Sequence, residues 1–138
     1  MPSEPIFVDT SYIYALVNPN DQWHSLAAEW RSRVTAEGHA LLTTQFILAE
    51  IADGLSSIKF RQAAAKIIRA LTNNPEVEVV PSSAALFSEG LTLFESRGDK
   101  DWGLTDCTSF IVMRDHGLTR ALTTDDHFRQ AGFNALLL

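Results

Sequence analysis

The stretch IFVDTS, residues 6–11, decides the fold class of this chain. Three apolar residues with high β propensity form a run that is too short for a helix, and the run stops at an acidic residue followed by two hydroxyl residues. Asp, Thr and Ser are typical of the position just before a helix. The stretch therefore predicts a buried strand that leads directly into a helix, with Asp9 at the carboxyl end of the strand.

The same alternation continues through the rest of the chain. Residues 41–43, 77–80 and 120–124 are further strand candidates, and we expect a short edge strand over 135–138. Helical spacing of apolar residues separates these runs, over residues 23–38, 47–55, 60–71, 86–97 and 104–116. Strands that alternate with helices predict an α/β fold: three layers, α/β/α, around a mostly parallel sheet of four to five strands.

Length and composition indicate one soluble domain over residues 1–138. With 46% hydrophobic residues, the 138-residue chain can bury a single core. Residues 1–4 contain no basic targeting region, and no apolar run approaches the roughly 20 residues of a membrane span. We therefore expect a cytoplasmic protein without a membrane partner.

Charge and metal-ligand types narrow the function classes. A net charge of −6 argues against a high-affinity DNA-reading protein, but it allows an enzyme whose acids gather in a metal site. The single cysteine, Cys107, excludes an internal disulfide and a multi-thiolate zinc site. We expect it to be buried. The four histidines show no paired ligand spacing, so zinc is not expected.

Four acidic residues from separate segments are expected to meet at one edge of the sheet. Asp9 and Asp125 each follow a predicted strand, and ligands of such sheets bind outside the carboxyl ends of the strands. Glu50 lies about two turns into the helix after the second strand, and Asp106 lies in the first turn of the helix after Gly103. The four side chains can therefore converge.

Clustered carboxylates repel one another unless protons or cations compensate their charge. No Lys or Arg is adjacent in sequence to any of the four acids. Oxygen ligands suit Mg²⁺ or Mn²⁺, which can bind a phosphodiester and lower the pKa of a water molecule. The pattern predicts a hydrolytic phosphodiesterase site.

Four motifs together resemble the PIN domain, and VapC-type toxins in particular. They are VDTS at residues 8–11, Glu50, LTDC at 104–107 and TTDDHF at 123–128, and they cover nearly the whole chain in the family's order. The resemblance implies an Mg²⁺- or Mn²⁺-dependent endoribonuclease with an RNA substrate. It also implies a homodimer, and an antitoxin that places a basic side chain in the acidic pocket.

The resemblance also implies roles for individual residues. The metal-site acids are Asp9, Glu50, Asp106 and Asp125. Thr10 and Thr124 supply hydroxyl groups near the metal, and either Asp99 or Asp101 contributes a further acid. We expect dimerisation through apolar helix faces, including Trp23, Trp30 and the helix over residues 60–71.

Simpler structural roles remain open for these residues. Asp9 and Asp125 can act as helix caps, Glu50 can be a solvated helix residue, and Asp106 can be a first-turn acid with Thr105 as the cap. Two groups can contact RNA or belong to the ordinary core and solvated surface. They are the aromatic residues Tyr12, Trp23, Trp30 and Trp102, and the basic residues Lys59, Arg61, Lys66 and Arg69.

One class of enzyme and one class of regulator also carry an aspartate at the end of a strand. Each is excluded here because a residue that it requires is missing. A haloacid-dehalogenase phosphatase needs a second Asp at position 11, which is Ser11, and a receiver domain needs a lysine in residues 120–138, where there is none. Two alternatives to a toxin remain. They are an RNA-processing PIN nuclease without an antitoxin, and a PIN-like protein-binding module without catalysis.

Overall fold

The computed structural model describes residues 4–138. Residues 1–3 lie outside the described residues. They belong to the N-terminal segment, residues 1–4, in which the sequence predicts no basic targeting region. The strands are β1 (Ile6–Val8), β2 (Leu41–Thr44), β3 (Val77–Val80), β4 (Arg120–Leu122) and β5 (Asn134–Ala135). The helices are α1 (Thr10–Val17), α2 (His24–Glu37), α3 (Gln45–Gly54), α4 (Ile58–Asn73), α5 (Ala84–Ser96), α6 (Leu104–Asp115) and α7 (Asp126–Gln130).

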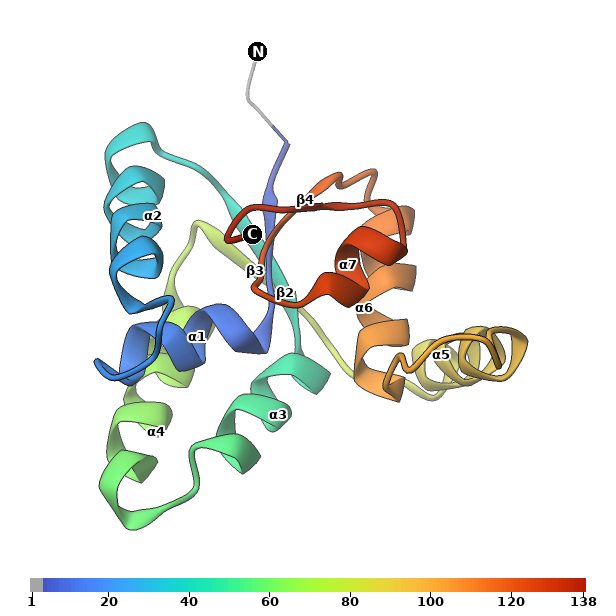
Figure 1. Ribbon diagram of the computed structural model, residues 1–138, viewed down its shortest axis with the longest axis horizontal. Coiled ribbons are helices and arrows are strands. Elements are labelled where there is room, and N and C mark those ends of the chain that lie inside the picture. The colour runs from blue at the N-terminus through green and yellow to red at the C-terminus, as the bar shows by residue number, and fades with distance from the viewer. Residues whose placement is uncertain (1–3) are drawn as a thin grey trace.

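The five strands form one sheet in the order β3-β2-β1-β4-β5, and every neighbouring pair is parallel. Helices α1, α2 and α4 lie on one side of this sheet, and α5, α6 and α7 lie on the other (Figure 1). Helix α3 contacts both α1 and α6 at the edge where the strands end. The predicted three-layer α/β/α architecture is confirmed.

Strand β1 occupies the centre of the sheet and marks the point where the strand order reverses. The chain continues from β1 to β2 and β3 on one side, and it returns to β4 and β5 on the other. The Asp9 N–H donates to the Leu122 carbonyl across this junction, at 3.2 Å. The carboxyl ends of β1 and β4 therefore meet at the crevice where such sheets bind ligands.

Three strands differ in extent from the sequence prediction. Strand β2 runs to Thr44 rather than ending at residue 43. Strand β4 ends at Leu122 rather than at residue 124, because the next residue turns its side chain back into the fold. The Thr123 hydroxyl accepts a hydrogen bond from the Asp125 N–H at 3.0 Å. The last strand is Asn134–Ala135 rather than 135–138, and Leu137 packs into the core outside any strand.

Aromatic packing fixes α6 and α7 against the sheet. The ring of Phe110 packs edge-on against Phe128 and against Trp102, both at 5.0 Å between centroids, and Phe128 also contacts Phe7 of β1. Tyr12 and Trp102 are buried in the core and are not available to stack on bases. Cys107 is fully buried, as expected.

Across residues 4–138, no helix combines the length and apolar character that a membrane crossing requires.

Helices α1 and α3 pack closely because a glycine ends α3. The Tyr14 hydroxyl donates to the Glu50 carbonyl at 3.0 Å, and its ring lies where a side chain at Gly54 would be. A Cβ at position 54 would overlap the phenol group. The contact fixes the helix that carries Glu50.

The Gly54→Ala variant should lower the free energy of unfolding by about 1–3 kcal/mol because of this overlap, although alanine is the better helix former. In a Tyr14→Ala background the same substitution should be neutral or stabilising. Chemical denaturation of the four proteins measures the difference. An equal cost of Gly54→Ala in both backgrounds would contradict the close approach.

Candidate metal and active site

Asp9 is a buried carboxylate at the end of β1, with only 4% of its surface exposed. Its Oδ2 atom accepts hydrogen bonds from the Thr123 hydroxyl at 2.7 Å and from the Ser11 hydroxyl at 2.8 Å. The Ser11 hydroxyl also accepts the Thr124 N–H at 2.9 Å. Asp9 caps α1 as well, through a longer contact of 3.4 Å from the Ser11 N–H. Its capping role and its place at the strand-end crevice are therefore both present.

Asp106 lies in the first turn of α6, on the side that faces α7. Its Oδ2 atom accepts the Gly103 N–H at 3.1 Å and contacts His127 Nδ1 at 3.0 Å. Helix α6 begins at Leu104, so Gly103 precedes it as the cap, and the alternative that placed Thr105 there is wrong. Because a carboxylate can only accept, the imidazole Nδ1 carries a proton in this contact.

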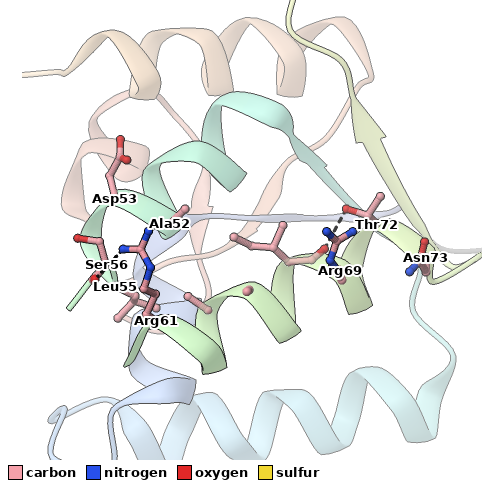
Figure 2. A pocket seen from close by; sticks show the side chains of 11 residues that line it. Ala52, Asp53, Leu55, Ser56, Arg61, Arg69, Thr72 and Asn73 are labelled. Carbon is pink, nitrogen blue, oxygen red and sulfur yellow. Dashed lines mark hydrogen bonds between the residues drawn. The ribbon is translucent and has the colours of Figure 1, made fainter. Parts of the chain in front are cut away.

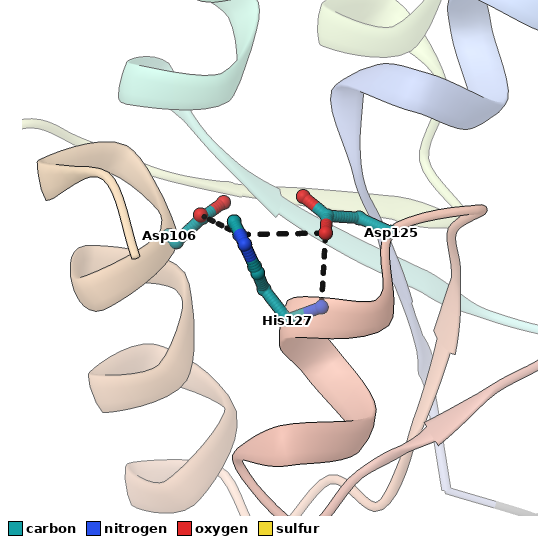
Figure 3. A group of neighbouring side chains, drawn as sticks. All are labelled: Asp106, Asp125 and His127. Carbon is teal, nitrogen blue, oxygen red and sulfur yellow. Dashed lines mark hydrogen bonds and ion pairs between the residues drawn. The ribbon is translucent and has the colours of Figure 1, made fainter. Parts of the chain in front are cut away.

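Asp125 and His127 belong to the turn that opens α7 (Figure 3). The Asp125 Oδ1 atom accepts the His127 N–H at 2.9 Å, and His127 Nδ1 lies 3.4 Å from the same oxygen. The imidazole ring therefore lies between Asp106 and Asp125, as Figure 3 shows.

Glu50 reaches the same edge from α3. Its Oε1 atom accepts a hydrogen bond from the Thr10 hydroxyl, at the start of α1. The backbone of the same residue accepts the Tyr14 hydroxyl bond, so α1 holds Glu50 at two points.

One pattern is common to all four acids. In each, a single carboxylate oxygen takes the hydrogen bonds from the protein, while the other oxygen has no protein hydrogen bond within residues 4–138. The donors are Thr10, Ser11, Gly103, Thr123 and His127. The arrangement orients each carboxylate and leaves one oxygen available to another ligand.

The electrostatics indicate that the four acids share one region. Burial is the main cause that raises the pKa of Asp9 to about 6, and the charges of Asp106 and Asp125 add to it. Burial also raises the pKa of Glu50, with the same two charges contributing. The pKa of Asp106 is raised by burial, against the hydrogen bonds from His127 and Gly103.

His127 responds to the same negative charge in the opposite sense. Burial alone would lower the pKa of its imidazole, but the hydrogen bond to Asp106 and the neighbouring carboxylates outweigh burial and raise it. Asp101 is among those carboxylates. A positive charge is therefore favoured at this position.

The donor set fits a hard divalent cation. Ligand atoms of Asp106, Asp125 and His127 lie within 4.8 Å of one another, a group that does not include Asp9 or Glu50. Because His127 donates its Nδ1–H to Asp106, the oxygens of the two aspartates are the ligands that this group offers to an ion. Carboxylate oxygens are the ligands that Mg²⁺ and Mn²⁺ prefer. A cation would also offset the burial and the neighbouring negative charges that together raise the pKa of Asp9 and Glu50.

Several neighbouring residues differ from the positions carried over from the family. The hydroxyl beside Asp9 comes from Thr123 and Ser11, whereas Thr124 contributes its backbone N–H. Asp99 pairs with Arg97 at the surface, and the Arg97 hydrogen bond lowers its pKa to about 2. Asp101, whose charge acts on His127, is therefore the better-placed of the two acids.

His127 is the main residue of the cluster that the sequence did not single out as a ligand. The only signal was its place two residues after the strand-end acid Asp125. The spacing of the histidines gives no indication of its role, because His127 lies beside the carboxylates of Asp106 and Asp125 rather than beside another histidine.

Comparisons with known proteins identify the family. The PIN domain model matches residues 6–134. The 23S rRNA-specific endonuclease VapC20 of Mycobacterium tuberculosis is 30% identical over 129 residues, which cover 93% of this chain and 95% of the relative. The crystal structure of VapC20, described as a sarcin-ricin loop cleaving toxin, has a TM-score of 0.80 at 29% identity, with 93% of this chain and 95% of that chain covered.

A second solved structure supports the fold alone. FitAcB from Neisseria gonorrhoeae has a TM-score of 0.62 at 19% identity, with 94% of both chains covered. The match of the PIN model to nearly the whole chain and the identity to VapC20 agree with the sheet order and with the acids at its carboxyl edge. The chain therefore belongs to the PIN-domain family, and it is of the VapC type.

Proposed function

We propose that this chain is the endoribonuclease toxin of a toxin–antitoxin pair, and that it acts in the cytoplasm with Mg²⁺ or Mn²⁺. The observation that carries the proposal is the set of four acids, each with one oxygen held by the protein and one oxygen free. The relationship to VapC20 favours a toxin over an RNA-processing nuclease or a binding module. Ribosomal RNA of the large subunit is therefore the first substrate to test.

Asp9, Glu50, Asp106 and Asp125 are the proposed metal-site residues. A divalent cation held there would bind a phosphate oxygen, lower the pKa of a water molecule and stabilise the leaving oxygen. Asp9 and Asp106 are the more enclosed carboxylates, and they would fix the ion, while Glu50 and Asp125 line the more open side. The buried surroundings of Asp9 keep bulk water from screening its charge.

His127 is proposed as a positioning residue for Asp106. Its Nδ1–H and the Gly103 N–H both bind Oδ2, so the carboxylate is fixed and Oδ1 is left for the cation. Residues that orient a metal-binding carboxylate in this way typically contribute roughly 10–100-fold to metal affinity or activity.

The proposed macromolecular partners are an antitoxin and a second copy of the chain. An antitoxin with a basic side chain would be attracted by the acid cluster. For the homodimer, Trp30 is a poor candidate because it is 9% exposed within a single chain. Helix α5 instead presents an exposed apolar row, Phe87, Leu91 and Phe94.

Replacing Leu91 with Glu in this row should convert a dimer into a monomer, because it would bury a charge at the centre of the interface. Light scattering at tens of micromolar protein measures the change. A monomeric wild-type protein would rule out the homodimer, and a dimeric Leu91→Glu variant would rule out this face.

The Asp9→Asn and Asp106→Asn variants should each lose more activity than the roughly 10–100-fold that removal of an outer ligand partner costs. Both keep the side-chain volume. The control is Asp99→Asn, which removes an exposed acid paired with Arg97. Cleavage of ribosomal RNA is measured with Mg²⁺, Mn²⁺ or chelator, with the new ends mapped by sequencing. Full activity in both folded variants would refute the assigned site.

The stability of the metal-free protein should fall as the pH rises from about 4 to about 6. The pKa of Asp9 is raised to about 6 in the folded protein, so the folded state holds the proton more tightly than the unfolded state in this interval. The loss is about 3 kcal/mol at 1.36 kcal/mol per pKa unit, and it is complete above pH 6.

Thermal denaturation in chelator measures this pH dependence. The Asp9→Asn variant should show a shallower dependence, and at pH 7.5 Mg²⁺ should raise the Tm of the wild type more than that of the variant. Identical pH profiles for the two proteins would contradict the charge burial at Asp9.

Replacing His127 with Leu should weaken Mg²⁺ binding roughly 10–100-fold, whereas His127→Asn should retain most of it. The reason is that an Asn amide can donate from nearly the position of Nδ1. Titration of the Mg²⁺-induced Tm shift provides a readout besides activity. Equal affinity in the Leu and wild-type proteins would show that His127 does not orient Asp106.

A further inference from the structure

Helix α4 has a charge pattern unlike the rest of this acidic protein. It carries Lys59, Arg61, Lys66 and Arg69 and no acidic residue, in a chain whose net charge is −6. Across residues 4–138, none of these four cations forms a salt bridge with a carboxylate, whereas Arg33, Arg97, Arg120 and Arg129 do. Among the described residues, Arg31, Lys100 and Arg114 also form no salt bridge, but they lie on separate segments, so α4 is distinguished by four cations on one helix without an acid.

Two of these cations line a cleft of about 630 Å³ between α3 and α4 (Figure 2). Arg61 and Arg69 are eight residues apart, which corresponds to about 12 Å along the helix axis. The Arg61 Nη1 atom donates to the Ser56 carbonyl at 3.1 Å, which holds that side chain against the cleft wall. At the end of the cleft near Arg69, the lining also includes the polar side chains of Thr72 and Asn73.

The cleft adjoins the acid cluster through α3. Asp53, the single acid among the residues that line the cleft, lies three residues after Glu50 on the same helix. The three-residue spacing places Glu50 and Asp53 on the same face of α3. A strand that leaves the proposed site can therefore pass Asp53 and reach the two arginines.

We infer that the cleft between α3 and α4 binds backbone phosphates of the RNA strand next to the cleaved bond, through Arg61 and Arg69. This inference rests on the proposed function. Arginine binds phosphate through two parallel hydrogen bonds, and the spacing of the two side chains spans more than one nucleotide. The contacts carry no base specificity, so they position the strand rather than select its sequence.

The lining favours an RNA strand over a protein partner. Protein interfaces depend on aromatic or large apolar anchors in enclosed pockets. The lining contains no aromatic residue among the described positions, and its largest apolar side chains, Leu55 and Ile68, are buried or half-buried. The exposed residues of the lining are small, polar or charged, and the two arginines are its cations.

The test is the salt dependence of RNA binding in chelator, which prevents metal-dependent cleavage. A fluorescein-labelled single-stranded RNA is titrated with wild type and with Arg61→Gln/Arg69→Gln at several salt concentrations. Loss of two phosphate contacts should reduce the slope of log Kd against log salt by about 1.4, at about 0.7 per contact on a single strand. If the affinities converge at 1 M salt, this slope corresponds to ~25-fold weaker binding at 0.1 M salt.

The matched control is Lys59→Gln/Lys66→Gln, which removes the same charge from the same helix at positions that do not line the cleft. It should change the slope less. Arg61→Lys/Arg69→Lys should keep the wild-type slope and lose part of the affinity, which separates charge from bidentate geometry. Unchanged binding by the arginine variant, or an equal loss in both glutamine variants, would overturn the inference.

Failure of the cleft inference can be distinguished experimentally from failure of the proposed nuclease function. The Mg²⁺-induced Tm shift depends on the acid cluster and should be the same in Arg61→Gln/Arg69→Gln as in wild type. If RNA binds through the arginines but no metal supports cleavage, the cleft stands and the nuclease proposal fails. If cleavage occurs with an unchanged KM in the arginine variant, the nuclease stands and the cleft fails.

Discussion

Repulsion between carboxylates at the carboxyl edge of the sheet is the constraint on which the rest of the structure depends. The fold brings the ends of β1 and β4 together, and α3 and α6 add a further acid each. Hydrogen bonds from hydroxyl, amide and imidazole donors hold one oxygen of every acid. These bonds reduce the cost of the cluster without removing it, because burial, with the charges of Asp106 and Asp125 added, still raises the pKa of Asp9 to about 6.

The sequence predicted the architecture and the two strand-end acids for the same physical reason. A parallel sheet places the residues after its strands at one edge, so the positions of Asp9 and Asp125 follow from the strands alone. Helix periodicity does not reveal how a helix is rotated relative to a sheet, so the positions of Glu50 and Asp106 showed only that they can reach this edge, and the family resemblance assigned them to the site. Ser11 and His127 could not be identified, because their contacts arise only when β1 lies beside β4 and α6 beside α7.

The acidic net charge and an RNA substrate are compatible because the charges are separated in space. The four clustered acids lie at the sheet edge, where a cation would change the sign of the local field. Four cations lie on α4, which carries no acid, and two of them line the cleft. Net charge is therefore a poor guide to nucleic-acid binding in a protein whose clustered acids and basic helix lie on different elements.

The hydrogen bonds that orient the acids join segments far apart in the chain. Thr10 contacts Glu50 forty residues later, and Asp9 depends on Thr123 more than one hundred residues later. A ribosome that synthesises this protein extends the chain past residue 127 before Thr123, Asp125 and His127 can join the others. The candidate site therefore cannot assemble on a nascent polypeptide until the segment that carries these three residues has been synthesised and has packed against β1 and α6.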